Sequence, residues 1–137
     1  MPTYFDKISL IQNHLDLIHR KNPGAAFSLF ASAKSAPLIF AIISALALAF
    51  IAYTIYKNNK LPMIAVTSLA FIAGGAAGNL VDRLIPPHKV IDFIDFYVGK
   101  WHWPAFNIAD SAITIGACLL AITIFFFRDP FEKNEKN

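Results

Sequence analysis

Charged residues and cysteines are both scarce in this sequence, and each shortage narrows what the protein can be. Charged side chains make up 15% of the 137 residues, whereas a soluble globular domain carries about a quarter. The single cysteine, Cys118, excludes an intrachain disulfide, and its apolar neighbours favour a packed side chain over a nucleophile. We therefore expect one domain, spanning residues 1–137, whose main solvent is lipid.

Two other patterns are missing. Residues 1–20 mix charges with single apolar residues, so they contain no continuous apolar stretch typical of a secretory signal peptide. The net charge is +3, but the basic residues are scattered and form no stripe suited to a phosphate backbone. We expect no nucleic-acid partner.

Long uncharged runs are abundant, because hydrophobic residues make up 56% of the chain. Residues 36–56 and 61–81 contain no charge, and each is long enough to cross a hydrocarbon core of about 30 Å as a helix. A third run, 106–127, contains one acid, Asp110, near its start. The sequence predicts an all-α polytopic membrane protein with these three spans.

The connections between the spans differ in length. Residues 57–60 suit a short antiparallel hairpin, whereas residues 82–105 form a longer connection rich in aromatic residues, which favour the membrane–water interface. Of the 12 Lys and Arg residues, seven lie in the N-terminal segment and the long connection and five lie on the other side. By itself, the positive-inside rule slightly favours a cytoplasmic location for the long connection.

Polar residues gather at the end of the spans beside the long connection. The second span ends in GGAAGNLVDR, where Gly74 and Gly78 are four apart. Gly75 and Asn79 have the same spacing. Small residues four apart on a helix let another helix backbone approach closely. Asn79 and Arg83 share a helical face and could hold a peptide carbonyl or orient a carboxylate. The alternative is a packing seam whose terminal arginine extends to the interface.

The third span begins FNIADSAIT, which places Asn107, Asp110 and Thr114 on one helical face. Asn is a preferred N-cap residue, and an acid three positions later can satisfy first-turn amides, so helix-start chemistry explains both residues. An ionised acid inside a span is costly in hydrocarbon, however, which makes a functional role the alternative.

The long connection contains VIDFIDF, with Asp92 and Asp95 three residues apart. We expect an interfacial segment that presents its acids on one side. His88 and His102 flank it, but no spacing matches a metal-ligand pattern. If Asp92 and Asp110 converge, two carboxylates in a low-dielectric pocket share a proton. One then activates a water as general base while the other donates a proton, and no metal or cofactor is needed.

Four motifs in this order resemble those of lipoprotein signal peptidases, also called signal peptidase II, the aspartic peptidase family A8. They are NPGAAFSLF at 22–30, GGAAGNLVDR at 74–83, VIDFIDF at 90–96 and WPAFNIADSAITIG at 103–116. Each motif is weak alone, but four in order with matching spacing are specific, and the resemblance extends from about residue 8 to residue 127.

The resemblance implies an endopeptidase that removes signal peptides from diacylglyceryl-modified bacterial prelipoproteins, cleaving before the lipidated cysteine. By the resemblance, the catalytic pair is Asp92 and Asp110, and Asp82 and Asp95 have structural roles. The implied site-lining residues are Asn22, Gly24, Asn79, Arg83 and Asn107. No cofactor or metal is implied.

The resemblance also implies a location. The protein would be a multi-pass monomer of the bacterial inner membrane whose site faces the periplasm, in contact with membrane lipids and sensitive to globomycin-type inhibitors. Residues 1–35 would contribute to a small periplasmic β-element, residues 82–105 would form a periplasmic loop whose part around Trp101 covers the site, and residues 128–137 would be a cytoplasmic tail.

One feature of the family is not seen in this sequence. The family has four transmembrane helices, with the additional helix before the NPG motif, and three spans are evident here. The alternative is therefore a truncated, catalytically inactive membrane protein of the same family that at most binds lipidated peptides. A small transporter or channel subunit is less favoured, because the polar residues gather at one end of the spans.

Overall fold

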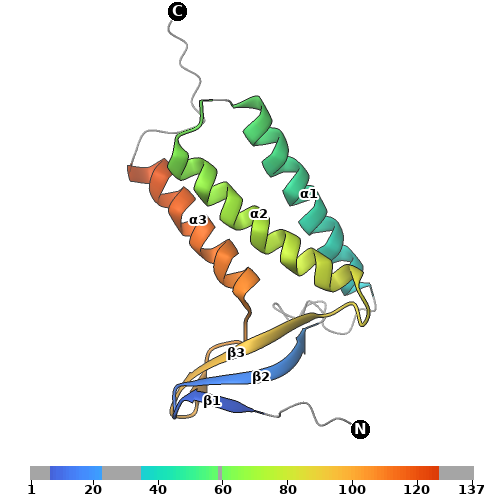
Figure 1. Ribbon diagram of the computed structural model, residues 1–137, viewed down its shortest axis with the longest axis vertical. Helices are drawn as coiled ribbons and strands as arrows, with labels where there is room; N and C mark the ends of the chain where they lie inside the picture. The colour runs from blue at the N-terminus through green and yellow to red at the C-terminus, as the bar shows by residue number, and fades with distance from the viewer. Residues whose placement is uncertain (1–6, 23–34, 59, 127–137) are drawn as a thin grey trace, which may run out of the picture.

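The computed structural model describes residues 7–22, 35–58 and 60–126. In these ranges the chain forms three helices and a small antiparallel sheet (Figure 1). The elements in chain order are β1 (Ile8–Ile11), β2 (Leu15–Asn22), α1 (Ala36–Lys57), α2 (Met63–Leu84), β3 (Val90–Val98), β4 (Trp101–His102) and α3 (Ile108–Phe126). The helices lie side by side with α2 in the middle, and the sheet crosses one end of them.

Each of the three helices is long and apolar enough to cross a membrane, so the prediction of three apolar helices is confirmed. Their ends differ slightly from the uncharged runs. Pro62, with φ −64° and ψ 149°, is extended, and α2 begins at the next residue. At its other end α2 continues past Asp82 to Leu84, because this end meets the sheet, where polar side chains find partners.

Close contact between α2 and α3 depends on small residues. A Cβ atom added to Gly116 would lie 2.6 Å from the carbonyl oxygen of Ser68, and one added to Gly75 would lie 2.7 Å from Cγ1 of Ile113. Gly74, by contrast, faces open space. The packing seam predicted from the glycine spacing therefore exists, and Gly75 is its central residue in α2.

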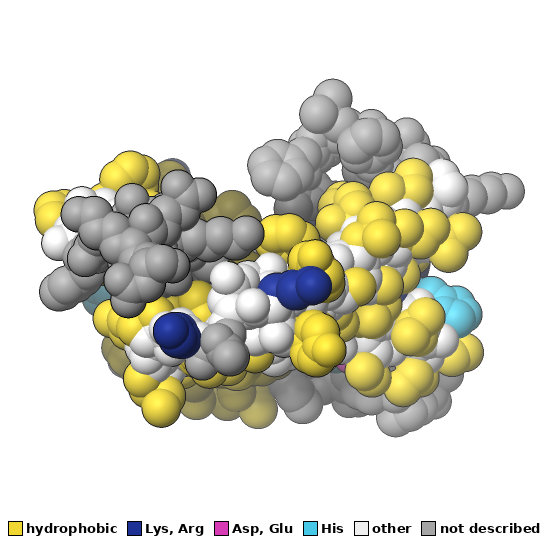
Figure 2. Space-filling model, turned by 90° about the horizontal axis from the view of Figure 1, so that it is seen from above, with side chains coloured by type: hydrophobic (Ala, Val, Ile, Leu, Met, Phe, Trp, Pro, Cys, Tyr) yellow, Lys and Arg dark blue, Asp and Glu magenta, His cyan; other side chains and the backbone are white. Residues whose placement is uncertain are grey.

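Four hydroxyl side chains within the helices make hydrogen bonds to their own helix. The hydroxyl groups of Ser44, Thr54, Ser68 and Thr123 each donate to the backbone carbonyl four residues earlier. Many large apolar side chains of the helices are exposed, and hydrophobic side chains cover much of the described surface in the view from above (Figure 2). Both features suit a helix whose surroundings cannot supply hydrogen bonds.

The sheet has the strand order β1-β2-β3-β4, with antiparallel neighbours. Residues 82–105, treated as a loop in the sequence, contain its longest strand, β3. Apart from its two acids, β3 consists of β-branched and aromatic residues, the types that are enriched in strands. An irregularity in β2 between Leu17 and Arg20 brings Arg20 opposite Asp92, as expected where one strand carries an extra residue.

The sheet places Asp92 and Asp95 on opposite faces, because successive side chains of a strand alternate and these residues are three apart. Asp95 pairs across the sheet with Asp16, whereas Asp92 lies on the face that meets the helices. The expectation that the segment presents both acids on one side was wrong, since that arrangement requires a helical period.

Candidate functional site

A cluster of buried polar side chains lies where the end of α2, the start of α3 and β3 meet. Asp92 is 2% exposed, Asn107 4% and Asn79 7%. Asn79 comes from the last turns of α2, Asp92 from β3, and Asn107 immediately precedes α3. Burying polar groups is costly unless they are hydrogen-bonded, so their partners define the site.

Asn107 and Asp110 cap the start of α3 reciprocally. The backbone N–H of Asp110 donates to Oδ1 of Asn107 at 2.9 Å, and the backbone N–H of Asn107 donates to Oδ2 of Asp110 at 3.2 Å. This is the geometry of a capping box. The interpretation of these two residues as the cap of the helix is therefore confirmed.

The same two side chains also reach into the site. Nδ2 of Asn107 donates to Oδ1 of Asp92 at 3.0 Å and lies 3.3 Å from Oδ1 of Asn79. Nδ2 of Asn79 donates to Oδ1 of Asp110 at 2.8 Å. The two carboxylates are thus connected through two asparagine side chains. The sequence left helix capping and a functional role as alternatives for Asn107 and Asp110, and in the structure these residues do both.

Asp92 receives an amide at each carboxylate oxygen. Nδ2 of Asn22, at the end of β2, donates to Oδ2 at 2.8 Å, and Asn107 occupies Oδ1. Burial raises the pKa of Asp92 and the nearby charge of Asp110 adds to this, whereas the two amides and the charge of Arg20 act in the opposite direction. The net pKa of Asp92 lies above its ordinary value.

Arg83 contacts the site through the backbone of Asn79. Its Nη1 donates to the carbonyl oxygen of Asn79 at 2.9 Å, and its guanidinium lies 5.5 Å from the centre of the Phe40 ring. Its Nε is buried and, among the described residues, has no hydrogen-bond partner. The arginine therefore fixes the last turn of α2 and places a positive charge near the acids.

The structure brings together most of the residues proposed from the sequence: Asn22, Asn79, Asp92, Asn107 and Asp110, with Arg83 bound to Asn79. Gly24 lies outside the described residues. Asp82 is 3.5 Å from the backbone nitrogen of Ile91. Asp95 lies on the opposite face of the sheet, where its Oδ1 is 2.9 Å from Nδ1 of His102. The described ranges contain no group of His, Cys, Asp or Glu side chains arranged to hold a metal.

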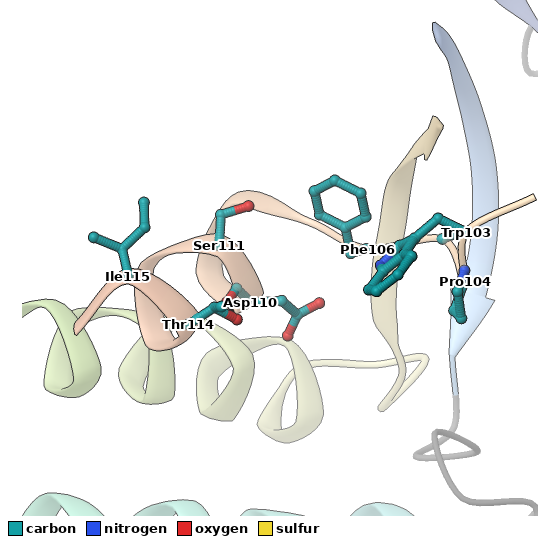
Figure 3. A pocket seen from close by; sticks show the side chains of 8 residues that line it. Trp103, Pro104, Phe106, Asp110, Ser111, Thr114 and Ile115 are labelled. Carbon is teal, nitrogen blue, oxygen red and sulfur yellow. Dashed lines mark hydrogen bonds between the residues drawn. The ribbon is translucent and has the colours of Figure 1, made fainter. Parts of the chain in front are cut away.

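A pocket of about 460 Å³ adjoins Asp110, and the sequence analysis did not identify it. Figure 3 shows Asp110, Ser111, Thr114 and Ile115 on the first turns of α3, with Trp103, Pro104 and Phe106 from the preceding segment. Ala105 completes the lining. Trp101, expected to cover the site, is exposed on β4 and packs edge-on against Trp103. The aromatic content of residues 82–105 was the only sequence signal for the pocket.

Comparison with known proteins gives consistent matches. The sequence profile of a family described as signal peptidase (SPase) II matches residues 1–126. A lipoprotein signal peptidase from Paraburkholderia phymatum is 52% identical over 100 residues, which cover 72% of this chain and 59% of that protein. The corresponding protein of Syntrophus aciditrophicus is 40% identical over 119 residues, 85% of this chain and 73% of that protein. The chain thus spans less than two thirds of the length of the first of these relatives.

Solved structures agree with the sequence matches. A structure described as a bacterial membrane enzyme, determined by the in meso method at 2.3 Å resolution, superposes with a TM-score of 0.75. It is 31% identical in sequence, and the match covers 96% of this chain and 77% of that one. Another of the same description, at 1.9 Å resolution, has the same TM-score with 30% identity.

Proposed function

This chain belongs to the signal peptidase II family, and from that membership we propose that it removes signal peptides from bacterial prelipoproteins. The proposed reaction is hydrolysis of the peptide bond that precedes a diacylglyceryl-modified cysteine, by an intramembrane aspartic endopeptidase. The observation that carries the proposal is the pair of carboxylates, Asp92 and Asp110, joined through Asn79 and Asn107 at one end of three apolar helices.

The two aspartates are the proposed catalytic residues. One carboxylate takes a proton from a water molecule, whose oxygen then attacks the scissile carbonyl carbon. The other, protonated, donates its proton to the carbonyl oxygen, which gives a gem-diol intermediate. When the C–N bond breaks, the first carboxyl passes the proton it took from water to the departing amine, and the second recovers a proton from the diol hydroxyl. The water supplies a hydroxyl to the new carboxyl terminus and a proton to the new amino terminus, so no cofactor or metal takes part.

The asparagines are proposed to position the pair. Amide groups from Asn22, Asn79 and Asn107 hold three of the four carboxylate oxygens, and the backbone N–H of Asn107 holds the fourth. Neutral donors orient a carboxylate without the large preference for its charged form that a cation imposes. A pair that must exchange protons during each turnover benefits from such partners. Gly24 and Arg83 are proposed as further site-lining residues by family resemblance.

The proposed setting is the bacterial inner membrane, with the site at its periplasmic face. In this arrangement residues 1–35 and 82–105 lie on the periplasmic side, residues 128–137 lie in the cytoplasm, and the protein acts as a monomer. Membrane lipids surround the spans, and globomycin-type compounds are expected to inhibit. The alternative of a catalytically inactive relative is not supported, because both carboxylates and their amide partners are present.

The test is cleavage of a diacylglyceryl-modified prolipoprotein peptide by the protein in liposomes, with the products identified by mass spectrometry. We expect one cut, immediately before the modified cysteine, and none with the Asp110→Asn variant. The unmodified peptide serves as a control for the lipid requirement. Cleavage that persists in Asp110→Asn would exclude the two-aspartate mechanism, and absence of cleavage by the unsubstituted protein would contradict the proposed activity.

A further inference from the structure

The pocket beside Asp110 is more apolar than its lining residues suggest. The hydroxyl of Ser111 donates to the carbonyl oxygen of Asn107 at 3.1 Å, and that of Thr114 donates to the carbonyl oxygen of Asp110 at 2.9 Å. Both hydroxyls are therefore turned back onto their own helix. Ser111 and Thr114 therefore line the pocket mainly with carbon atoms, and Asp110 is the only charged residue in its lining.

The pocket has a direction along α3. It begins at Asp110, in the first turn, and reaches Thr114 and Ile115 in the second. Five residues of α-helix advance by roughly 7 Å, so the pocket extends from the carboxylate toward the middle of the span. Its opposite wall, from Trp103 to Phe106, comes from the segment that follows the sheet (Figure 3). Ile115 is 49% exposed, which leaves the deeper end open to surrounding lipid.

We propose that this pocket holds one acyl chain of the diacylglyceryl group on the substrate cysteine. The inference rests on the proposed function and specifies which part of the substrate the pocket binds. The group that occupies it must start beside the scissile bond, be apolar and continue into the bilayer. An acyl chain meets all three conditions, whereas a peptide side chain ends within the pocket and a signal-peptide helix, about 10 Å wide, exceeds it.

The pocket acts by positioning the substrate. An acyl chain that leaves the bilayer for an apolar pocket exchanges one hydrocarbon environment for another, so the hydrophobic effect contributes little. Packing against Trp103, Phe106 and Ile115 instead restricts where the attached cysteine lies relative to Asp110. Fixing a remote part of a substrate in this way raises the reaction rate by orienting the bond to be broken.

Photo-crosslinking tests occupancy directly. The probe is a diacylglyceryl peptide that carries a diazirine on one acyl chain, bound to the Asp92→Asn variant so that it is not cleaved. We expect the label on residues 103–106 and 111–115. The protein offers a competing apolar groove of about 470 Å³, lined by Val66, Thr67, Ala70, Phe71, Gly74, Gly75 and Ala112. Label confined to that groove, or spread evenly along the helices, would overturn the inference.

A substitution that fills the pocket tests its effect on catalysis. Ile115→Trp should lower kcat/KM for a substrate with two palmitoyl chains by about tenfold, the scale on which apolar pockets discriminate size, and should leave a substrate with two butyryl chains nearly unaffected. Ile122→Trp is the matched control, because Ile122 lies two turns deeper on the same face of α3 and is 45% exposed.

The outcomes separate the two proposals. If the unsubstituted protein cleaves both substrates and Ile115→Trp does the same at equal rates, the acyl-chain pocket is wrong and the peptidase stands. An equal loss with both substrates would also contradict the inference, because it indicates damage to the site and not chain-length discrimination. If no variant cleaves, the peptidase proposal fails, while crosslinking still decides whether the chain lies in the pocket.

Discussion

The two faces of the sheet hold aspartates in opposite surroundings. On the face that meets the helices, Asp92 accepts amide hydrogen bonds from Asn22 and Asn107. On the other face, Asp16 and Asp95 lie opposite each other on paired strands, and each has a basic partner. Nζ of Lys7 lies 2.6 Å from Oδ2 of Asp16, and His102 pairs with Asp95.

Tyr97 joins the two pairs on that outer face. Its ring stacks on His102 with centroids 4.7 Å apart, and Nζ of Lys7 lies 5.1 Å from its centroid. Burial alone acts to raise the pKa of Asp16, but the Lys7 ammonium, with the polar side chains of Ser9 and Tyr97, outweighs it, so the pKa lies below its ordinary value. The pKa of Lys7 is raised by the same contact.

This comparison shows that the groups around an aspartate determine the direction in which its pKa is shifted. Residues of the same kind on one small sheet have pKa values displaced in opposite directions, upward for Asp92 and downward for Asp16. A cationic partner keeps an acid charged, which makes it a structural group. Amide partners in a buried site leave the acid able to change protonation state, which acid–base catalysis requires.

The largest expected effect comes from removing the charge on each face in turn. Asp92→Asn should lower the rate of prolipoprotein cleavage by about 10³-fold or more, because it removes one of the two proton-transfer groups. Asp95→Asn, on the same strand, should leave the rate within about threefold, since its partly exposed contact with His102 contributes little. Equal losses in the two variants would show that the faces are not functionally distinct.

The second prediction separates the two roles of Asn107. Asn107→Ala should destabilise the protein by about 1 kcal/mol through loss of the helix cap and should lower cleavage by about 100-fold through the misplaced carboxylates. Asn107→Ser is the matched control, because serine is an equally good N-cap but has no amide. Thermal unfolding in detergent should recover with serine, whereas cleavage should not. Recovery of both would mean that capping is the sole role.

The third prediction concerns a variant that gives Asp92 a cationic partner, like the one that Asp16 has on the other face of the sheet. Asn22→Lys places a cation beside Asp92, which should lower the pKa of that carboxyl. The acid limb of the pH–rate profile should then move to lower pH, and cleavage near neutrality should fall by about tenfold because a weaker base is less effective. Asn22→Gln keeps the amide and should leave the limb in place. An unchanged profile with lysine would show that Asp92 does not set that limb.

The smallest effect is expected at Lys7. Because the folded-state pKa of Asp16 is depressed, its contribution to stability is fully present above the unfolded value of about 3.8 and is lost as pH falls through the lower, folded value. Lys7→Met should remove this pH-dependent part of the stability, and it should leave cleavage nearly unchanged because the Lys7–Asp16 pair lies on the face of the sheet opposite Asp92. Unfolding temperatures measured from neutral to strongly acidic pH check the expected change in stability. A large loss of cleavage in Lys7→Met would contradict the expectation that this pair does not affect the site.

Some of this arrangement was visible in the sequence. Uncharged runs predicted the three helices because a span is a local property of composition. The roles of Asp92 and Asp110 were suggested by motif order, and their shared partners emerged only from the structure. The opposite faces of Asp92 and Asp95 could not be foreseen, because the strand forms by pairing with β2, some seventy residues away in the chain. The pocket, by contrast, is formed by one stretch of chain, and it depends on how residues 103–106 lie against the first turns of α3.

The position of Asn107 at the start of α3 has a consequence for biosynthesis. Its amide reaches Asp92 only when the first turn of the last described helix has formed, and Asp110 belongs to that same turn. A chain that is still being made and has been extended only as far as β3 carries one carboxylate and no pair. The proposed hydrolytic site is therefore complete only once Asn107 and Asp110 have been synthesised, after α1, α2 and β3.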